Sequence, residues 1–408
     1  MKREIFKKKK YKPAIFLVLF IVAALFSTPA LTEAQEEVKP VWGPYLTLKN
    51  GSTVTVNWKT VNSSSGFLKY DRANFYLENE ELRRRNESKE DESSFHYVDM
   101  TGLTPGTEYV YRAGKDVGPS AVNYFGSPAD DPKSFSFFVY GDTRTCPRRH
   151  RLVASEMALD PFDPAFIIHT GDLVGSPVSP NWSNFFWAIE PFSKSTPIVP
   201  ALGNHERNDD SYYEAFKLPS GGGDYGEQWY SFSYGSVKFI VLDSNADQIG
   251  LSRFLEERKW LLKELKRNSK PVTVVVFHHP IYSSEYSTGV DKGLADSWGS
   301  LFKKYGVDLV FNGHVHSYER AVKNGITYVV TGGGGAPTGN LSSRFDFSRK
   351  AKGDSLHYLR VLVKETEINL QMVEVAQINR DVDAGRVGCN VDMDASRVIL
   401  DEAVIKID

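Results

Sequence analysis

This chain of 408 residues has few cysteines, few histidines and little net charge. Its two cysteines, Cys146 and Cys389, are too few for a disulfide framework, and they leave one bridge or two free thiols equally open. The formal net charge is −2, so the composition indicates no nucleic-acid-binding surface. Histidine occurs nine times in the whole chain, and the positions of these histidines are therefore informative.

A long uncharged apolar run lies near the N-terminus. Seven lysines and arginines stand between Lys2 and Lys12, and residues 14–26 are uniformly apolar. Cleavage positions at Ala30 or Ala34 complete the pattern of a signal peptide over residues 1–34. The run is shorter than the roughly 20 residues of a membrane span, which favours a cleaved signal peptide. An uncleaved N-terminal segment is the alternative, and it would be the only membrane contact that we expect. The pattern predicts an exported protein that is secreted, periplasmic or held at the cell surface.

The character of the sequence changes near residue 134. Over residues 38–131, short alternating strands such as "STVTVNW" are separated by turn signals, which indicates a small all-β sandwich. Over residues 134–375, apolar strand-like runs alternate with helical stretches such as residues 253–267, which indicates an α/β domain. Residues 376–408 are predicted only as a C-terminal extension of unclear role.

Five apolar runs of the α/β region end in polar residues that can bind metals. In chain order these endings are Gly141-Asp142, Thr170-Gly171-Asp172, Gly203-Asn204-His205-Glu206, His278-His279-Pro280 and Asn312-Gly313-His314-Val315-His316. A single Gly-Asp or His-x-His means little, because an aspartate often caps a helix and a histidine often packs in a core. Together, however, the endings gather five of the nine histidines at strand ends, where open α/β sheets form their sites.

These endings, with "GLTPGTEYVYR" and "GHVHSYER", resemble the motifs of calcineurin-like metallophosphoesterases of the purple acid phosphatase branch. The resemblance covers about residues 135–370. It implies a two-sheet α/β metallophosphoesterase sandwich, preceded by a small all-β fibronectin type III-like sandwich. It also implies a hydrolase that acts on phosphate esters of small molecules, as an acid phosphatase does. A phosphodiesterase or nucleotidase of the same superfamily, and a non-catalytic exported binding or adhesion protein, are the alternatives.

The resemblance further implies two divalent metal ions. Oxygen and imidazole ligands without thiolate suit zinc, iron or manganese. By matching motif positions, the first ion would be held by Asp142, Asp172 and His316, and the second by Asp172, Asn204, His278 and His314. Asp172 would bridge the two ions, and a hydroxide bound to them would attack phosphorus.

Four further residues are expected around the reacting phosphate. His205 would protonate the leaving oxygen or bind the phosphoryl group, and Glu206 would orient His205. Arg144 would either reach the phosphoryl oxygens or pair with Asp142. His279 is expected to contact the substrate.

The sequence departs from the purple branch at two places and from other members of the superfamily at a third. The tyrosine that binds ferric iron in purple enzymes, three positions after the second Gly-Asp, is here Gly175. A histidine that follows the first aspartate by two positions in other superfamily members is here Arg144, which cannot ligate a metal. A histidine pair that contacts phosphate in the purple branch is here Ser287 and Thr288, which carry no positive charge. We therefore expect a colourless protein, a loosely held first ion and relative tolerance of diesters.

Overall fold

The computed structural model describes residues 41–87, 93–114, 122–341, 345–378, 389 and 397–407. These residues belong to one compact unit, Glu37–Asp408. The predicted signal peptide lies outside the described residues. Within the described part of the chain, no helix is long and apolar enough to cross a membrane.

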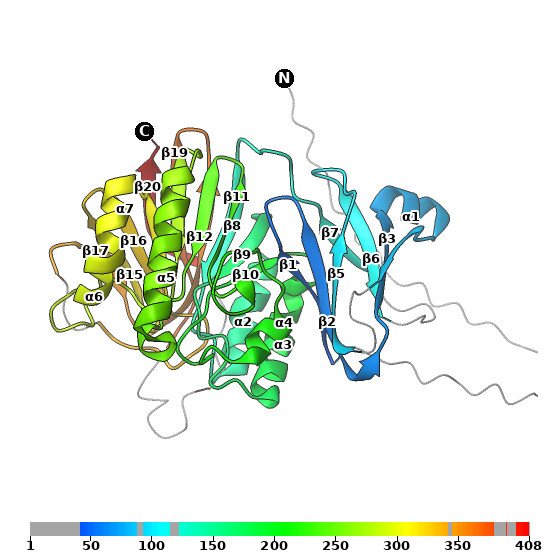
Figure 1. Cartoon of the computed structure of the whole chain (residues 1–408), viewed down its shortest axis with the longest axis horizontal. Coiled ribbons are helices and arrows are strands. Elements are labelled where there is room, and N and C mark those ends of the chain that lie inside the picture. Colours follow the sequence, from blue (N-terminus) through cyan, green and yellow to red (C-terminus); the bar gives the residue numbers. More distant parts are fainter. Residues whose placement is uncertain are drawn as a thin grey trace, which may run out of the picture. The chain divides into compact units, whose positions relative to one another are not determined.

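The described residues form three β-sheets (Figure 1). The nine-stranded sheet has the order β20 (Val398–Lys406), β19 (Glu367–Gln377), β18 (Ser355–Val363), β8 (Phe135–Tyr140), β9 (Pro164–His169), β10 (Ile198–Pro200), β1 (Trp42–Leu48), β2 (Val54–Ser64) and β5 (Ser93–Met100). The seven-stranded sheet has the order β11 (Tyr230–Tyr234), β12 (Val237–Val241), β13 (Val272–Val276), β14 (Leu309–Asn312), β16 (Ile326–Thr331), β15 (Tyr318–Lys323) and β17 (Ser348–Lys352). The four-stranded sheet has the order β4 (Arg84–Glu87), β3 (Phe67–Arg72), β6 (Glu108–Ala113) and β7 (Asn123–Gly126).

Helices cover the outer faces of the two large sheets. The described helices are α1 (Ala73–Asn79), α2 (Pro147–Ala158), α3 (Ser179–Ser193), α4 (Asp210–Ala215), α5 (Ala246–Arg267), α6 (Lys292–Leu294) and α7 (Ser300–Tyr305). Buried side chains of α2 and α3 pack against the nine-stranded sheet, and those of α5 and α7 pack against the seven-stranded sheet (Figure 1). The helix predicted over residues 253–267 is confirmed as the larger part of α5, whose buried Phe254 and Leu261 lie on one face.

An aromatic core joins the two large sheets face to face. Phe137 of β8 lies edge-on to Phe239 of β12 at 5.3 Å, and Phe166 of β9 lies edge-on to the same ring at 5.3 Å. Edge-to-face contacts of this kind are the favoured geometry of packed aromatic rings. The predicted fold class is confirmed: two sheets form the α/β sandwich, and an all-β region precedes it.

The N-terminal β-structure continues the nine-stranded sheet. β1 pairs antiparallel with β2 and parallel with β10, where Thr47 lies opposite Ile198. Trp42 and Tyr45 pack on Phe186 of α3, with ring centroids 4.9 and 4.4 Å apart. The all-β and α/β regions therefore share a sheet and a core.

Part of the predicted C-terminal extension is a strand. β20 pairs antiparallel with β19 at the end of the nine-stranded sheet. Its Asp401 accepts hydrogen bonds from Tyr318 at 2.6 Å and from Arg320 at 2.7 and 3.0 Å. These bonds tie the nine-stranded sheet to β15 of the seven-stranded sheet.

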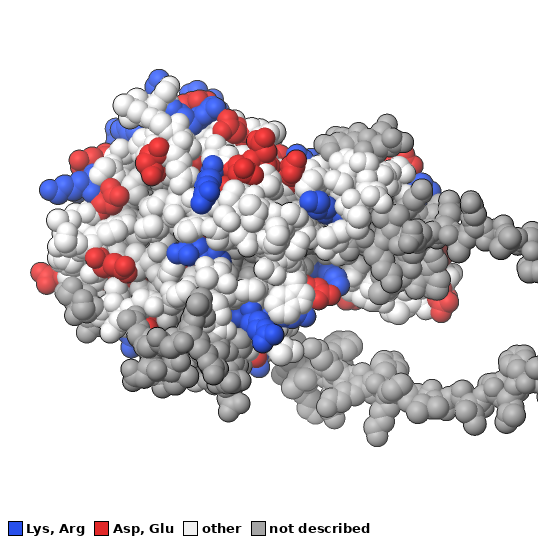
Figure 2. Space-filling view, turned by 90° about the horizontal axis from the view of Figure 1, so that it is seen from below, with Lys and Arg blue, Asp and Glu red and all other residues white. Residues whose placement is uncertain are grey.

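Basic and acidic side chains are mixed on the face drawn in Figure 2, where blue and red groups alternate among uncharged ones. Interspersed charge of both signs is usual for a solvated protein surface.

Candidate metal centre

The predicted ligands follow strands of both large sheets. Asp142, Asp172 and Asn204 come after the parallel strands β8, β9 and β10, and His278 and His314 come after the parallel strands β13 and β14. The carboxyl ends of parallel strands share one edge of a sheet, so each sheet presents its polar residues together. The two edges meet, because the imidazole of His278 lies 2.9 Å from the carbonyl oxygen of Thr170.

The three residues expected to hold a first ion form one cluster. The ligand atoms of Asp142, Asp172 and His316 all lie within 4.8 Å of one another. His316 Nδ1 donates to the Pro337 carbonyl at 2.7 Å, so Nε2 carries the lone pair of the ring. This Nε2 atom lies 3.5 Å from Asp142 Oδ1. The backbone N–H of His314 donates to the Asp142 carboxylate at 3.0 Å and so fixes its direction.

The residues expected to hold a second ion converge beside the first cluster. Asn204 Oδ1 lies 3.1 Å from His278 Nε2 and 3.2 Å from His314 Nδ1. His278 Nε2 also lies 3.3 Å from Asp172 Oδ1. The Nδ1–H of His278 is donated to Thr170, so its Nε2 lone pair faces the cluster. Asp172 is thus the carboxylate that the two clusters share.

Burial sets the protonation of these groups. It lowers the pKa of His278 well below the usual value and the pKa of His314 to about 4. Neutral imidazole is the form that ligates a metal. Burial also raises the pKa of Asp142, because it penalises the carboxylate form, and contact with Asp142 raises the pKa of His316 in spite of burial. A divalent ion would favour the carboxylate form, so this donor set fits a metal.

Three of the expected ligands have strained backbones. The φ angles of Asp142, Asp172 and His314 are +58°, +56° and +68°. Each left-handed residue other than glycine costs on the order of 1–3 kcal/mol, and such strain gathers at functional sites. The neighbouring glycines are needed for close approach: a Cβ on Gly203 would lie 2.3 Å from Asp172 Oδ1, and one on Gly313 would lie 2.5 Å from Asp142 Oδ2.

The motifs and this geometry agree with comparisons to known proteins. The calcineurin-like phosphoesterase family matches residues 135–318, and the N-terminal domain family of purple acid phosphatases matches residues 41–127. The chain thus combines a calcineurin-like phosphoesterase domain with an N-terminal domain of the purple acid phosphatase family. The family predicted from the motifs is confirmed.

Several known proteins are similar to this chain. An uncharacterized Mycobacterium tuberculosis protein is 29% identical in an alignment of 337 positions that covers 69% of this chain and 62% of that protein. Fe(3+)-Zn(2+) purple acid phosphatase 12 of Arabidopsis thaliana is 28% identical over 76% of this chain and 70% of its own. The solved structure of purple acid phosphatase PPD1 from yellow lupin has a TM-score of 0.67 at 19% identity, and covers 81% of this chain and 71% of that one. The chain thus spans less than two thirds of the mycobacterial protein's length.

A cleft opens onto the two clusters. Its lining consists of Arg144, Asp172, Asn204, His205, Glu285, His314, His316, Pro337, Thr338 and Gly339. His205 lies beside the shared carboxylate: its Nδ1 donates to the Gly175 carbonyl at 2.8 Å, and its Nε2 lies 3.8 Å from Asp172 Oδ2. The Nε2 atom of His205 is therefore the one turned toward the centre.

Glu206 lies beneath the cleft. It is fully buried and accepts hydrogen bonds from the backbone N–H groups of Gly203 at 2.7 Å, and of Asp172 and Val174 at 3.0 Å. Burial, and then the nearby charge of Asp172, raise the pKa of Glu206 to about 8. These bonds hold together the two loops that carry Asp172 and Asn204, a role that the motif spacing did not predict.

The other predicted substrate contacts lie apart from this lining. His279 belongs to the second cluster, because the ligand atoms of His278, His279 and His314 all lie within 4.8 Å of one another, and its Nδ1 is 3.0 Å from the Ser244 hydroxyl. Ser287 and Thr288 are exposed, and the Thr288 hydroxyl donates to the Val290 carbonyl at 3.0 Å. Among the described residues, none of these three lines the cleft.

Glu285 and the Pro337–Gly339 segment are cleft residues that sequence reasoning missed. Glu285 stands seven positions after His278, on the loop where a phosphate-binding histidine pair was sought. A carboxylate on that loop was a usable signal, because it changes the charge that the substrate meets.

The structure also adds to two points that the sequence left open. Arg144 pairs with Asp172, its Nε lying 3.0 Å from Oδ2, and it lines the cleft, so its contact with phosphoryl oxygens stays a prediction. Cys146 and Cys389 form a disulfide, so Cys146 is no thiolate donor.

Proposed function

We propose that this protein is an exported hydrolase of phosphate esters that works with two divalent metal ions. The observation that carries the proposal is the convergence of two ligand clusters on one carboxylate, Asp172. The match to the phosphoesterase family supports the reaction class, and small-molecule phosphate esters are the substrates that this class implies.

Each residue would have a definite task. Asp142, Asp172 and His316 would hold the first ion, and Asp172, Asn204, His278 and His314 the second. When bound, such ions make water acidic and neutralise charge on the phosphoryl oxygens. His205, with its Nδ1–H given to Gly175, would present Nε2–H to the leaving oxygen and release the proton there. Glu206 would hold the ligand loops in register from below.

Hydrolysis of p-nitrophenyl phosphate, with and without a chelator, tests this function. The expected result is turnover that the chelator abolishes and that added zinc, manganese or iron restores. A folded protein that binds two ions but hydrolyses neither mono- nor diesters would instead be a binding or adhesion protein, the second function considered from the sequence.

Two features support export. The first is the basic and then apolar N-terminal sequence. The second is the disulfide between Cys146 and Cys389, because such bonds persist in oxidising compartments. N-terminal sequencing of the protein secreted by an expressing cell is expected to begin after Ala30 or Ala34, and recovery of an intact N-terminus in the membrane fraction would favour an anchor.

The absence of a tyrosine at position 175 predicts a colourless enzyme. Among the described residues, no tyrosine lines the cleft. Iron-loaded protein is expected to lack a visible tyrosinate-to-iron band. Gly175→Tyr is the matched variant, because a Cβ there would meet only Thr145 atoms at 3.9 and 4.0 Å. This variant should gain the band, and a band of equal strength in the unmodified protein would contradict the prediction.

The position of Glu285 in the cleft lining predicts that dianionic monoesters bind weakly. A carboxylate at the cleft repels a dianion more than a monoanionic diester, and one extra unit charge at 4 Å in water is worth about 1 kcal/mol, or roughly fivefold in affinity. Glu285→Gln is therefore expected to lower KM for a monoester about fivefold more than it lowers KM for a diester. Glu256→Gln, which removes an exposed carboxylate on α5, is the control. Equal changes for both esters would refute the role of Glu285.

A further inference from the structure

Arg144 occupies part of the first ligand cluster. Its Nε donates to Asp172 Oδ2 at 3.0 Å, and its Nη2 lies 3.3 Å from His316 Nε2. Because His316 gives its Nδ1–H to Pro337, its Nε2 accepts from the guanidinium. The two atoms that Arg144 contacts belong to two of the three residues that would hold the first ion.

The two oxygens of the Asp172 carboxylate have different partners. Asp172 Oδ2 faces Arg144, whereas Oδ1 lies 3.3 Å from His278 Nε2 and accepts the backbone N–H of His205 at 3.0 Å. The guanidinium therefore forms hydrogen bonds with residues that would ligate the first ion. The atoms expected to ligate the second ion still face one another.

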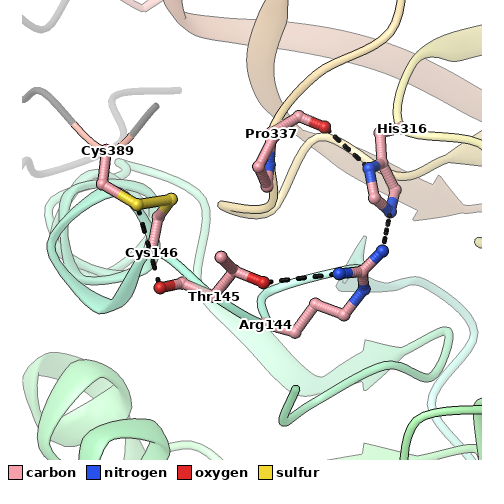
Figure 3. The surroundings of a disulfide bond; sticks show 6 residues. All are labelled: Arg144, Thr145, Cys146, His316, Pro337 and Cys389. Atoms are coloured by element: carbon pink, nitrogen blue, oxygen red, sulfur yellow. Dashed lines mark hydrogen bonds between the residues drawn. A yellow bond between two sulfur atoms is a disulfide. The ribbon is translucent and has the colours of Figure 1, made fainter. Parts of the chain in front are cut away.

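A disulfide holds the end of the loop that carries Arg144 (Figure 3). Cys146 is fully buried, directly precedes α2, and is bonded to Cys389, 243 positions later. The Cys146 N–H donates to the Arg144 carbonyl at 3.0 Å, and Cys389 Sγ lies 3.8 Å from the Thr145 carbonyl oxygen. The disulfide thus packs against the backbone of the two residues before it.

The residue between Arg144 and the disulfide is strained. Thr145 has φ of +76°, which is an outlier for a β-branched residue. Its hydroxyl lies 3.3 Å from Arg144 Nη1 and accepts a hydrogen bond from it (Figure 3). A backbone in this conformation persists only where its surroundings hold it, and the disulfide is the covalent part of those surroundings.

We propose that Arg144 is a positioning residue that competes with the first metal ion for Asp172 and His316, and that the Cys146–Cys389 disulfide holds Arg144 in that place. The inference rests on the proposed two-metal function. A guanidinium and an ion cannot use the same lone pairs, so the ion must break two hydrogen bonds and then bind beside a fixed positive charge. The first site is weakened by this competition, and the second site is not.

Zinc binding to the metal-free protein, measured by calorimetric titration without substrate, tests the competition. The unmodified protein is expected to bind one ion tightly and a second ion weakly. Arg144→Ala should tighten the weak site about 10–100-fold, the range over which residues around metal ligands alter affinity, and should leave the tight site unchanged. Arg148→Ala is the matched control, because it removes an exposed arginine from the start of α2 and should change neither constant.

A second arm isolates the disulfide. The paired substitutions Cys146→Ala and Cys389→Ala should tighten the weak site in the same direction as Arg144→Ala, and by less. In the Arg144→Ala background the same pair should have no further effect, because the side chain that the disulfide positions is gone. Thermal unfolding recorded for each variant sets a titration temperature at which all of them are folded.

Three results would overturn the inference. If Arg144→Ala leaves the dissociation constant of the weak zinc site unchanged, the missing tyrosine alone weakens the first site. Weakening of either site in that variant would mean that Arg144 supports the ligands. A cysteine effect that persists without Arg144 would remove the disulfide from the mechanism. Failure of the proposed function is distinct from all three, since it appears as two bound ions without hydrolysis in the unmodified protein.

Discussion

Asp172→Asn is expected to lose both hydrolysis of phosphate esters and bound metal. Asp172 is the residue common to the two clusters: Oδ1 faces His278 at 3.3 Å, and Oδ2 faces Arg144 at 3.0 Å. An amide offers one neutral oxygen where the carboxylate offers two charged ones, so neither ion would keep its full set of ligands. The rate should fall by more than the roughly 10²–10³-fold that one electrostatic donor contributes.

The measurement for Asp172→Asn is metal content by mass spectrometry together with turnover of p-nitrophenyl phosphate. Asp160→Asn is the matched control, because Asp160 is also a buried aspartate and pairs with Arg360 and Tyr358 away from the cleft. This control should lose stability and keep both ions. An Asp172→Asn protein that retains two ions and most of its activity would remove Asp172 from the bridging role.

His205→Ala is expected to lower turnover by about 10²–10⁴-fold, or roughly 3–5 kcal/mol, with both ions retained. The side chain of His205 is held by its hydrogen bond to the Gly175 carbonyl, and its backbone N–H holds Asp172 Oδ1. Alanine removes the proton donor and keeps that backbone bond, so the ligand loop should be preserved.

The leaving group of the substrate provides the internal control for His205→Ala. An alkyl phosphate needs a proton on its departing oxygen, whereas p-nitrophenolate leaves as an anion. The loss of turnover should therefore be larger for the alkyl ester. Equal losses for both substrates would show that His205 binds the phosphoryl group and does not act as the acid.

Local patterns in the sequence account for most of the elements. The runs "FSFFVY" and "PAFIIH" form the strands β8 and β9, because a continuous apolar run bounded by turn residues suits a strand buried on both faces. Trp182, Phe185 and Phe186 recur at helical spacing and are buried in α3. Periodicity is a property of neighbouring residues, and it is therefore legible without the fold.

The identities of the expected metal ligands also came from the sequence. Polar residues directly after parallel strands lie at the carboxyl edge of a sheet, so the sequence alone could place Asp142, Asp172 and His278 at such edges. The resemblance to the phosphoesterases then assigned each residue to an ion, and that assignment stays a prediction.

The sequence by itself determined the family, the strand and helix pattern and the set of polar strand ends, because each is written in residues close together along the chain. Only the tertiary structure decided which distant residues meet. It paired Arg144 with Asp172 and His316, bonded Cys146 to Cys389, and set Glu206 under backbone N–H groups. Such contacts depend on loop paths and strained turns, whose geometry follows from packing across the whole molecule and has no periodic signal in the sequence.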